Sequence, residues 1–384
     1  YLSIFYFCNM SNLKEIAQVF FKLGCFAFGG PAVHIAMMEE EIVSKRKWMS
    51  SEHFLDLIGA TNLIPGPNST EMTMHCGHER GGWKGMFVAG ICFIFPAVFI
   101  TGTLAWLYVR FGNLPNVKPF IAGIQPAVVV IIIQAVFKLG KKAIKNIALG
   151  LFGAITLGLN LYGFSEIVSL LITAVLGTIY FSLKNKTQAN GFNPILLTLL
   201  GSSTLGLSKI TTVSIFFSFF KIGAILYGSG YVLFAYLDAE FVETGLMTRA
   251  ALLDAIAIGQ FTPGPVLSTA TFVGFQLNGF WGAIAATTGI FLPSFLLVLL
   301  LNPLIPKMKK STILKTFLNL MSVGAVALML SVILKVGTSS LLEVKSAIIF
   351  TISLILVFTT KKINAMHIIL LGSILGYISS FIKL

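Results

Sequence analysis

A repeated unit organises this sequence. Four segments form two matched pairs: "FFKLGCFAFGGPAV" (20–33) with "FFKIGAILYGSGYV" (219–232), and "NLIPGPNSTE" (62–71) with "QFTPGPVLST" (260–269). The offset between the copies is 199 residues at Lys22 and Lys221 and 198 residues at Pro65 and Pro263. Because an internal repeat constrains the whole architecture, we expect the two copies to share one arrangement of helices.

The composition is that of a membrane protein. Of the 384 residues, 56% are hydrophobic and 11% are charged, whereas about a quarter of the residues in a soluble domain are charged. Apolar runs long enough to cross a bilayer include 119–137 and 363–382. The sequence therefore predicts an all-α polytopic membrane protein embedded in the lipid bilayer. This hydrophobicity excludes a soluble nucleic-acid-binding protein, despite the net charge of +13.

The basic residues indicate how the two copies are oriented. Lysine and arginine gather in short clusters between apolar segments, as expected of cytoplasmic loops: 45–47, 141–145, 184–186, 307–310 and 361–362. If the Pro-Gly-Pro segments are re-entrant hairpins, about five crossings per copy place all these clusters on one side. We therefore expect an inverted internal repeat with about ten transmembrane helices plus re-entrant PGP half-helix hairpins.

The chain divides accordingly into three parts. We expect a first transmembrane repeat over 12–183, a linker over 184–209, and a second, inverted repeat over 210–384. Within the linker, the apolar segment 195–207 is too short for a comfortable span, and we expect it to lie at the membrane interface. This layout predicts a multi-pass protein of the cytoplasmic (inner) membrane.

Each copy breaks a predicted helix at a Pro-Gly-Pro sequence: Pro65, Gly66 and Pro67 in the first copy, and Pro263, Gly264 and Pro265 in the second. A helix that restarts within the membrane directs unpaired N–H groups and the positive end of its dipole into a cavity. In the first copy Asn68 can cap the new helix, with Glu71 three residues later as in a capping box. Two such starts, converging near the midplane, would bind an anion. The alternative is that the breaks are kinks that relieve packing strain.

The predicted anion site draws on both copies. Polar side chains follow the breaks: Asn68, Ser69, Thr70, Ser268 and Thr269. Lys22 and Lys221 lie in apolar helices, where a lysine at the bilayer centre costs roughly 2.5–3.5 kcal/mol and is a functional candidate; snorkelling to the interface is the alternative. The small residues of the segments that follow let backbone N–H groups approach a ligand: Gly29, Gly30, Gly228, Ser229 and Gly230.

Two further polar features follow the first break. Glu71 has no acidic counterpart, because Thr269 occupies the matching position. It is a candidate carboxylate for proton coupling, with ordinary helix capping as the alternative. His75, Cys76 and His78 lack a second cluster of ligands, so we expect no metal site and no cofactor.

At these residues the chain resembles the chromate ion transporter family in its long, two-domain form. The resemblance covers residues 12 to about 300 and rests on four segments: "FFKLGCFAFGGPAVHIAMMEEEIV", "IPGPNSTEMTMHCGHERGGWKG", "FFKIGAILYGSGYV" and "GQFTPGPVLSTATFVGFQLNGFWGA". It implies a proton-coupled exporter of chromate, of which sulfate is a close structural analogue. The second copy departs from the family's pattern at Ser229, where a further glycine is often found, and this bears on the anion preference.

The residues indicate an oxyanion site, and with the family resemblance they imply a secondary active transporter that exports chromate or sulfate by alternating access around that central site. With the inside negative, each elementary charge gains roughly 2.3 kcal/mol per 100 mV on crossing, so a dianion is driven outward. The alternatives are an oxyanion channel, or a transporter of sulfate or another oxyanion without chromate preference. An enzyme is disfavoured, because the 14 acidic residues lie mostly in loops. The physiological anion, the coupling ion and the formation of a homodimer stay open.

Overall fold

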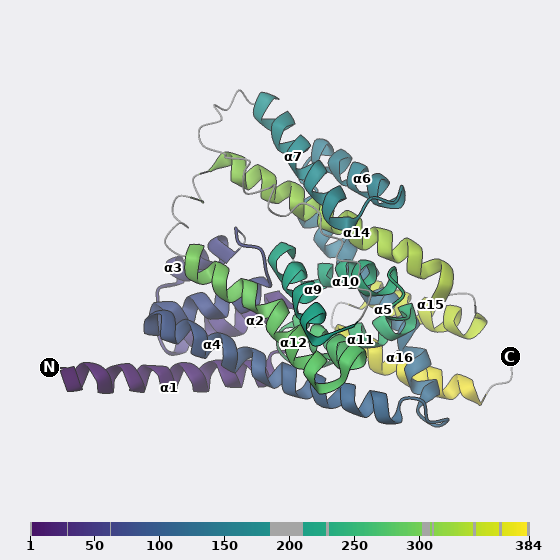
Figure 1. Cartoon of the computed structure of the whole chain (residues 1–384), viewed down its shortest axis with the longest axis horizontal. Coiled ribbons are helices and arrows are strands. Elements are labelled where there is room, and N and C mark those ends of the chain that lie inside the picture. Colours follow the sequence, from purple (N-terminus) through teal and green to yellow (C-terminus); the bar gives the residue numbers. More distant parts are fainter. Residues whose placement is uncertain are drawn as a thin grey trace.

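The computed structural model describes residues 2–28, 30–61, 63–184, 210–227, 230–301, 308, 311–340, 343–360 and 363–381. These residues form helices and turns without a strand, which confirms the predicted all-α fold (Figure 1). The helices up to the linker are α1 (Leu2–Phe26), α2 (Pro31–Met38), the π-helix η1 (Glu39–Lys45), α3 (Ser51–Thr61), α4 (Asn68–Phe111), α5 (Lys118–Ala143), α6 (Ile147–Leu161) and α7 (Glu166–Lys184). Most of the predicted linker, including 195–207, lies outside the described residues.

The second part of the chain has a similar order of elements. Its helices are α9 (Thr212–Ile225), the 3-10 turn η2 (Gly230–Val232), α10 (Leu233–Leu237), the π-helix η3 (Asp238–Val242), α11 (Arg249–Phe261), the 3-10 turn η4 (Val266–Ser268), α12 (Thr269–Leu301), α14 (Thr312–Ser340), α15 (Val344–Thr359) and α16 (Ala365–Ser380). Each copy has a π-helix at the matching place, between the helix that carries the lysine and the helix that leads into the break.

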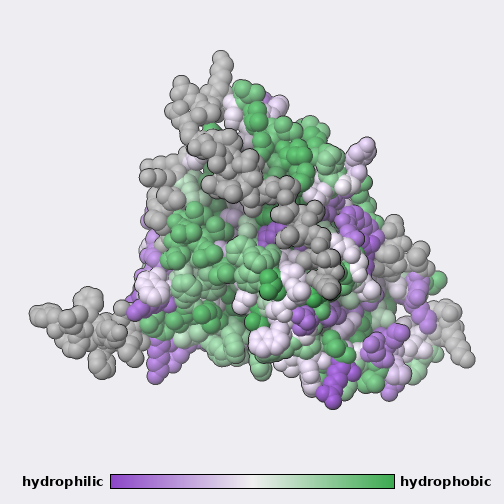
Figure 2. Space-filling view, viewed as in Figure 1, coloured by the Kyte–Doolittle hydropathy of each residue, from purple (hydrophilic) through white to green (hydrophobic). Residues whose placement is uncertain are grey.

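The lengths and surface of these helices fit a membrane protein. Among the described residues, five helical segments are long and apolar enough to span a bilayer: α4, α5, α7, η4 together with α12, and α14. Shorter apolar helices are α6, α9, α15 and α16. Apolar side chains cover much of the face seen in Figure 2. The structure therefore supports a polytopic membrane protein, whereas the predicted number of about ten crossings stays a prediction.

The two copies contain the same helix–helix contact. In the first copy α1 packs on α4, and in the second α9 packs on α12. A Cβ atom on Gly24 of α1 would lie 2.6 Å from the carbonyl oxygen of Phe93, and one on Gly223 of α9 would lie 2.4 Å from that of Ile290. Only glycine permits this approach, because it brings backbone against backbone.

The long helix α4 reverses direction after about four turns. Gly82 has a φ of +62°, and Gly279 has a φ of +56° at the matching place in α12. After the first reversal the chain runs back along itself, because a Cβ on Gly77 would lie 2.5 Å from the carbonyl oxygen of Gly85. A straight helix would hold residues eight apart about 12 Å from each other. Each break is therefore followed by a short half-helix that packs against the long helix after it.

Helices of the two copies interlock. The first copy's α5 packs on α15 and α16 of the second, and the second copy's α14 packs on α6 and α7 of the first. In Figure 1 α14 runs beside α6 and α7. The long helices α4 and α12 also pack on each other. Each break therefore touches the other copy, since a Cβ on Gly66 would lie 2.6 Å from Oγ of Ser294 and one on Gly264 would lie 3.0 Å from Cβ of Ala97.

Candidate functional site

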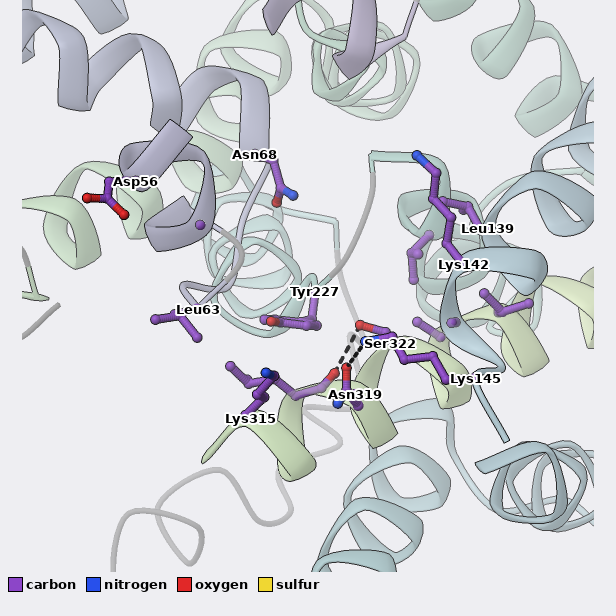
Figure 3. Close-up of a pocket in the computed structure, with 16 residues that line it drawn as sticks. Asp56, Leu63, Asn68, Leu139, Lys142, Lys145, Tyr227, Lys315, Asn319 and Ser322 are labelled. Atoms are coloured by element: carbon purple, nitrogen blue, oxygen red, sulfur yellow. Dashed lines mark hydrogen bonds between the residues drawn. The ribbon is translucent and has the colours of Figure 1, made fainter. Parts of the chain in front are cut away.

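An open cavity of about 560 Å³ adjoins the first Pro-Gly-Pro break (Figure 3). Its walls come from α3, the start of α4, the end of α5, the segment that follows α9, and α14. Asn68, the first residue of α4, and Tyr227, which follows α9, both line it. The cavity is therefore built by both copies of the repeat.

Positive charge predominates in the cavity lining. Lys142, Lys145 and Lys315 line it, against the single carboxylate of Asp56. The Nζ atom of Lys145 donates to Oδ1 of Asn319 at 2.9 Å, which links the residues after α5 to α14 (Figure 3). Two of these lysines belong to the cluster at 141–145 that the charge pattern assigns to the cytoplasmic side. An excess of lysines in a concave site raises the local concentration of anions.

The first break ends in an N-cap that the sequence did not predict. Gly66 has a φ of +140°, in the region that favours glycine. The backbone N–H groups of Thr70 and Glu71 donate to the carbonyl oxygen of Pro67 at 2.8 and 3.1 Å. The predicted cap by Asn68 and its capping box with Glu71 are wrong, because Pro67 is the N-cap and its side chain has no acceptor.

The polar residues after Asn68 are buried at the junction between the copies. Ser69, Thr70 and Glu71 have relative exposures of 3%, 0% and 0%. Among the described residues, neither carboxyl oxygen of Glu71 nor the hydroxyl of Thr70 has a hydrogen-bond partner. A Cβ on Gly66 would lie 2.1 Å from Oε1 of Glu71 and 2.6 Å from Oγ of Ser294. The carboxyl group of Glu71 and the hydroxyl of Ser294, from α12, therefore both lie against Gly66.

The second break is closed by a contact with the first copy. Gly264 has a φ of +85°, and its N–H donates to the carbonyl oxygen of Ala27 at 2.9 Å. Ser268 and Thr269 are fully buried, and the hydroxyl of Thr269 donates to the carbonyl oxygen of Val266 at 2.8 Å. Neither side chain lines the cavity. The two half-helix starts thus differ, since the first borders an open cavity and the second is packed shut.

The two lysines predicted to bind the anion form ion pairs. Lys22 lies 3.3 Å from Glu41, and Lys221 lies 2.5 Å from Glu240. The hydroxyl of Ser218 also donates to Glu240, at 2.8 Å. Neither lysine lines the cavity, and their role as anion ligands stays a prediction.

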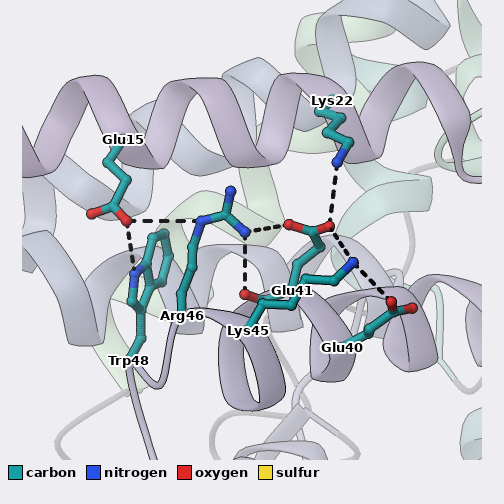
Figure 4. A network of polar contacts seen from close by, with 7 residues as sticks. All are labelled: Glu15, Lys22, Glu40, Glu41, Lys45, Arg46 and Trp48. Carbon is teal, nitrogen blue, oxygen red and sulfur yellow. Dashed lines mark hydrogen bonds and ion pairs between the residues drawn. The ribbon is translucent and has the colours of Figure 1, made fainter.

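Glu41 lies at the centre of a larger charged network (Figure 4). It accepts hydrogen bonds from Lys22, Lys45 and Arg46, and Arg46 lies 3.8 Å from Glu15 on α1. Burial by itself would raise the pKa of Glu41, but the hydrogen bonds from Arg46, Lys45 and Lys22 lower it to about 2. The π-helix η1 is thereby held against α1.

The small residues predicted to approach the ligand lie at the ends of short elements. Gly30 is the N-cap of α2, and Gly230 begins η2. Gly29, Gly228 and Ser229 lie outside the described residues. Their predicted role in binding stays a prediction.

Two aspartates at matching positions of the repeat lie in different environments. Asp56 on α3 corresponds to Asp254 on α11 by the 198-residue offset. Asp254 is buried and accepts hydrogen bonds from the Tyr108 hydroxyl at 2.6 Å and from the Gln125 amide at 3.3 Å. Correspondingly, α11 packs on α5, whereas α3 and α14 both line the open cavity.

The sequence reasoning missed most of the cavity lining. It interpreted the cluster with Lys142 and Lys145 as a topology signal only, and it did not select Tyr227, Asn319 or Ser322. The matched aspartates were visible in the repeat alignment. The residues of α14 that line the cavity show no local sequence motif, because the residues that they face in the cavity come largely from the other copy.

The histidines after the first break do not form a cluster of metal ligands. His75 and Cys76 are buried in α4, and His78 is partly exposed. Across the part of the chain that the structure describes, no group of three or more His, Cys, Asp or Glu side chains is placed to hold a metal ion.

Comparison with known proteins assigns the family. The sequence model of the chromate transporter family matches residues 14–179 and 213–377, one region in each copy of the repeat. The chain belongs to the chromate transporter family. This membership supports a function in chromate transport and, with the apolar helices, a multi-pass location in a membrane. It favours a transporter over an enzyme.

Relatives of this chromate transporter family member extend over nearly its whole length. A probable chromate transport protein of Synechococcus elongatus is 28% identical, with 96% of this chain and 95% of the relative aligned. The chromate transport proteins of Cupriavidus metallidurans and Pseudomonas aeruginosa are 26% and 27% identical, with 96% of this chain and 93% and 92% of the relatives aligned. No solved structure gives a significant match.

Proposed function

We propose that this protein is a secondary active transporter that exports chromate, or the analogous dianion sulfate, across the cytoplasmic membrane. The cavity carries the proposal, because it joins the start of α4 to three lysines at the predicted cytoplasmic side. The names of three relatives, which are chromate transport proteins, support the choice of anion. Sulfate has the same charge and tetrahedral shape.

The dianion would bind at the start of α4, beside Asn68 and Tyr227. The positive end of the α4 dipole favours an anion there. The amide of Asn68 and the phenol of Tyr227 are hydrogen-bond donors. Lys142, Lys145 and Lys315 would attract the anion into the cavity.

The remaining predicted ligands belong to other steps of the cycle. Ser268 and Thr269 are sealed behind the closed second break, so they would reach an anion only after that break opens. Lys22 and Lys221 would bind only after separating from Glu41 and Glu240. We propose that these rearrangements accompany transport.

The different environments of the matched aspartates support alternating access. Asp254 ties α11 to Tyr108 and Gln125, which corresponds to a closed side. Asp56 lines the open cavity opposite Ser322 of α14. In an inverted repeat the opposite state exchanges the two arrangements. We propose that α3 then packs on α14, with Asp56 close to Ser322, while α11 leaves α5.

This asymmetry favours a carrier over an oxyanion channel. A channel requires a path that is open at both ends at once, whereas here the second break is held shut by Gly264 and Ala27. The inside-negative potential drives a dianion outward by roughly 2.3 kcal/mol per charge per 100 mV. Coupling to protons, implied by the family resemblance, is part of the proposal.

The experiment is flux of chromate and of sulfate into and out of liposomes that contain the purified protein. We expect saturable flux of a dianion, and weaker apparent affinity by about tenfold in the double variant Lys142→Ala/Lys315→Ala, since each removed charge contributes about 1 kcal/mol or less near the surface. Lys138→Ala is the matched control, because Lys138 is exposed on α5 and does not line the cavity. Flux equal to that of empty liposomes for both anions would overturn the proposal.

A further inference from the structure

Glu71 is a buried carboxyl group that the binding site described above does not use. It lies in the first turn of α4, three residues after Asn68, which lines the cavity. Three residues of helix correspond to about 4.5 Å along the axis. An anion bound at the start of α4 would therefore lie close to this carboxyl group.

The surroundings of Glu71 do not stabilise a negative charge. Its side chain is completely buried, and among the described residues it forms no ion pair and its oxygens accept no hydrogen bond. The facing helix α12 contains no ionisable residue and presents the hydroxyl of Ser294, which also has no hydrogen-bond partner among the described residues. An ionised carboxylate buried without a partner is costly, so the neutral acid is the stable form here.

The ionisable groups near Glu71 do not change this conclusion. Tyr227, from the segment after α9, is close enough to interact electrostatically with Glu71, but a neutral phenol supplies no positive charge. The cavity that Asn68 lines contains the acidic Asp56, and its three lysines, which belong to α5, the residues after it and α14, form no hydrogen bond with the Glu71 oxygens. On α4 itself the next ionisable side chain is His75, which is buried one turn further on. On α1, Lys22 is paired with Glu41.

We propose that Glu71 is a proton-binding site whose occupancy is coupled to that of the anion site. A dianion at the start of α4 repels an ionised Glu71 and so favours its neutral form. By reciprocity, a proton on Glu71 strengthens anion binding. One proton then accompanies each dianion, and the loaded protein moves one net negative charge instead of two. This inference rests on the proposed function, because it requires that the cavity binds a dianion.

Helix capping is the competing role for Glu71, but the hydrogen bond that capping requires is absent among the described residues. A capping carboxylate accepts a hydrogen bond from a first-turn N–H group. The α4 N-terminus has no side-chain cap, and the N–H of Thr70 and that of Glu71 itself donate to Pro67. The carboxyl group instead lies against Gly66 and Ser294, between the two copies, where it is placed to respond when they move relative to each other.

The test measures the binding of sulfate to the full chain in detergent, from about pH 6 to about pH 9. Sulfate is the probe because it stays a dianion over this range, whereas chromate itself takes up a proton near neutral pH. In the wild type, affinity should fall with rising pH by up to about tenfold per pH unit, the limit for one linked proton. Glu71→Gln, which mimics the neutral acid, should keep the affinity seen at low pH. Glu79→Gln, at the exposed end of the same half-helix, should follow the wild type.

A second measurement uses only the wild-type protein, so its result does not depend on whether a variant folds. In the wild type, the infrared carbonyl band of the neutral acid should disappear at a higher pH when sulfate is bound than when it is absent, because the dianion favours the protonated form. Loss of the band at the same pH with and without sulfate, or the same pH dependence of binding in Glu71→Gln as in the wild type, would overturn the proposal. If the wild type bound neither sulfate nor chromate at any pH, the proposed function would be overturned, and the inference about Glu71 with it.

Discussion

Lys22 and Glu41 form an ion pair that recurs, at the same spacing of 19 residues, between Lys221 and Glu240. Each pair ties the helix before a break, α1 or α9, to the π-helix that follows, η1 or η3. A lysine within an apolar helix is stabilised by such a partner. The matched lysines therefore hold equivalent elements together in both copies.

The charged network around Glu41 predicts a pH-dependent stability. Its pKa is lowered from 4.5 to about 2, so it stabilises the fold fully above about pH 4.5, and this contribution is lost as the pH falls towards 2. Glu41→Gln should cost about 1.5–3 kcal/mol at neutral pH, the range for hydrogen bonds to charged groups. Thermal unfolding in detergent should show this difference shrinking on acidification. Glu52→Gln, exposed on α3, should change little.

Variants of the Lys221–Glu240 ion pair can separate a structural role of Lys221 from a role in binding the anion. Lys221→Ala leaves Glu240 without its cation, so both stability and chromate flux should fall. Adding Glu240→Gln should restore most of the stability. If Lys221 also binds the anion, flux in the double variant should stay about tenfold or more below the wild type, because a charge-assisted hydrogen bond is worth about 1.5–3 kcal/mol. Recovery of flux together with stability would assign Lys221 a structural role only.

Alternating access predicts which residues can be cross-linked. In a background without the native cysteines, the pair Asp254→Cys and Gln125→Cys should be joined by a short, reducible bifunctional thiol reagent, since the ends of the two native side chains are in contact at 3.3 Å. The pair Asp56→Cys and Ser322→Cys should cross-link only when the cavity closes, and both cross-links should stop flux. Reduction should restore flux. Full transport with the second pair never cross-linking would contradict the proposed cycle.

The close contact of α1 with α4 predicts the effect of a single methyl group. Gly24→Ala and Gly223→Ala would each place a Cβ atom within 2.6 Å of a carbonyl oxygen. We expect each to lower stability by about 1–3 kcal/mol, the usual cost of overpacking. Gly158→Ala in α6 is the control, because no atom lies within 4 Å of the added Cβ. Its thermal midpoint should be unchanged or slightly higher, since alanine favours helix.

The sequence by itself determined the class of the protein, the duplication and the two breaks. These features depend on local patterns: hydrophobic runs too long for a soluble fold, proline in helices, and glycine where φ is positive, as at Gly66 and Gly264. The family resemblance rested on the same segments and was confirmed over both copies. Even so, local pattern misplaced the cap of α4, because both Asn68 and Pro67 are compatible with a helix start.

Only the tertiary structure decided what these elements contact. It paired Lys22 with Glu41, joined α5 and α14 to helices of the other copy, and placed Tyr227 beside Asn68 in one cavity. It also distinguished the open first break from the closed second one, although their sequences are matched. The physical reason is that these contacts link residues far apart in the chain. Their energies depend on how the two copies pack, which no local pattern encodes.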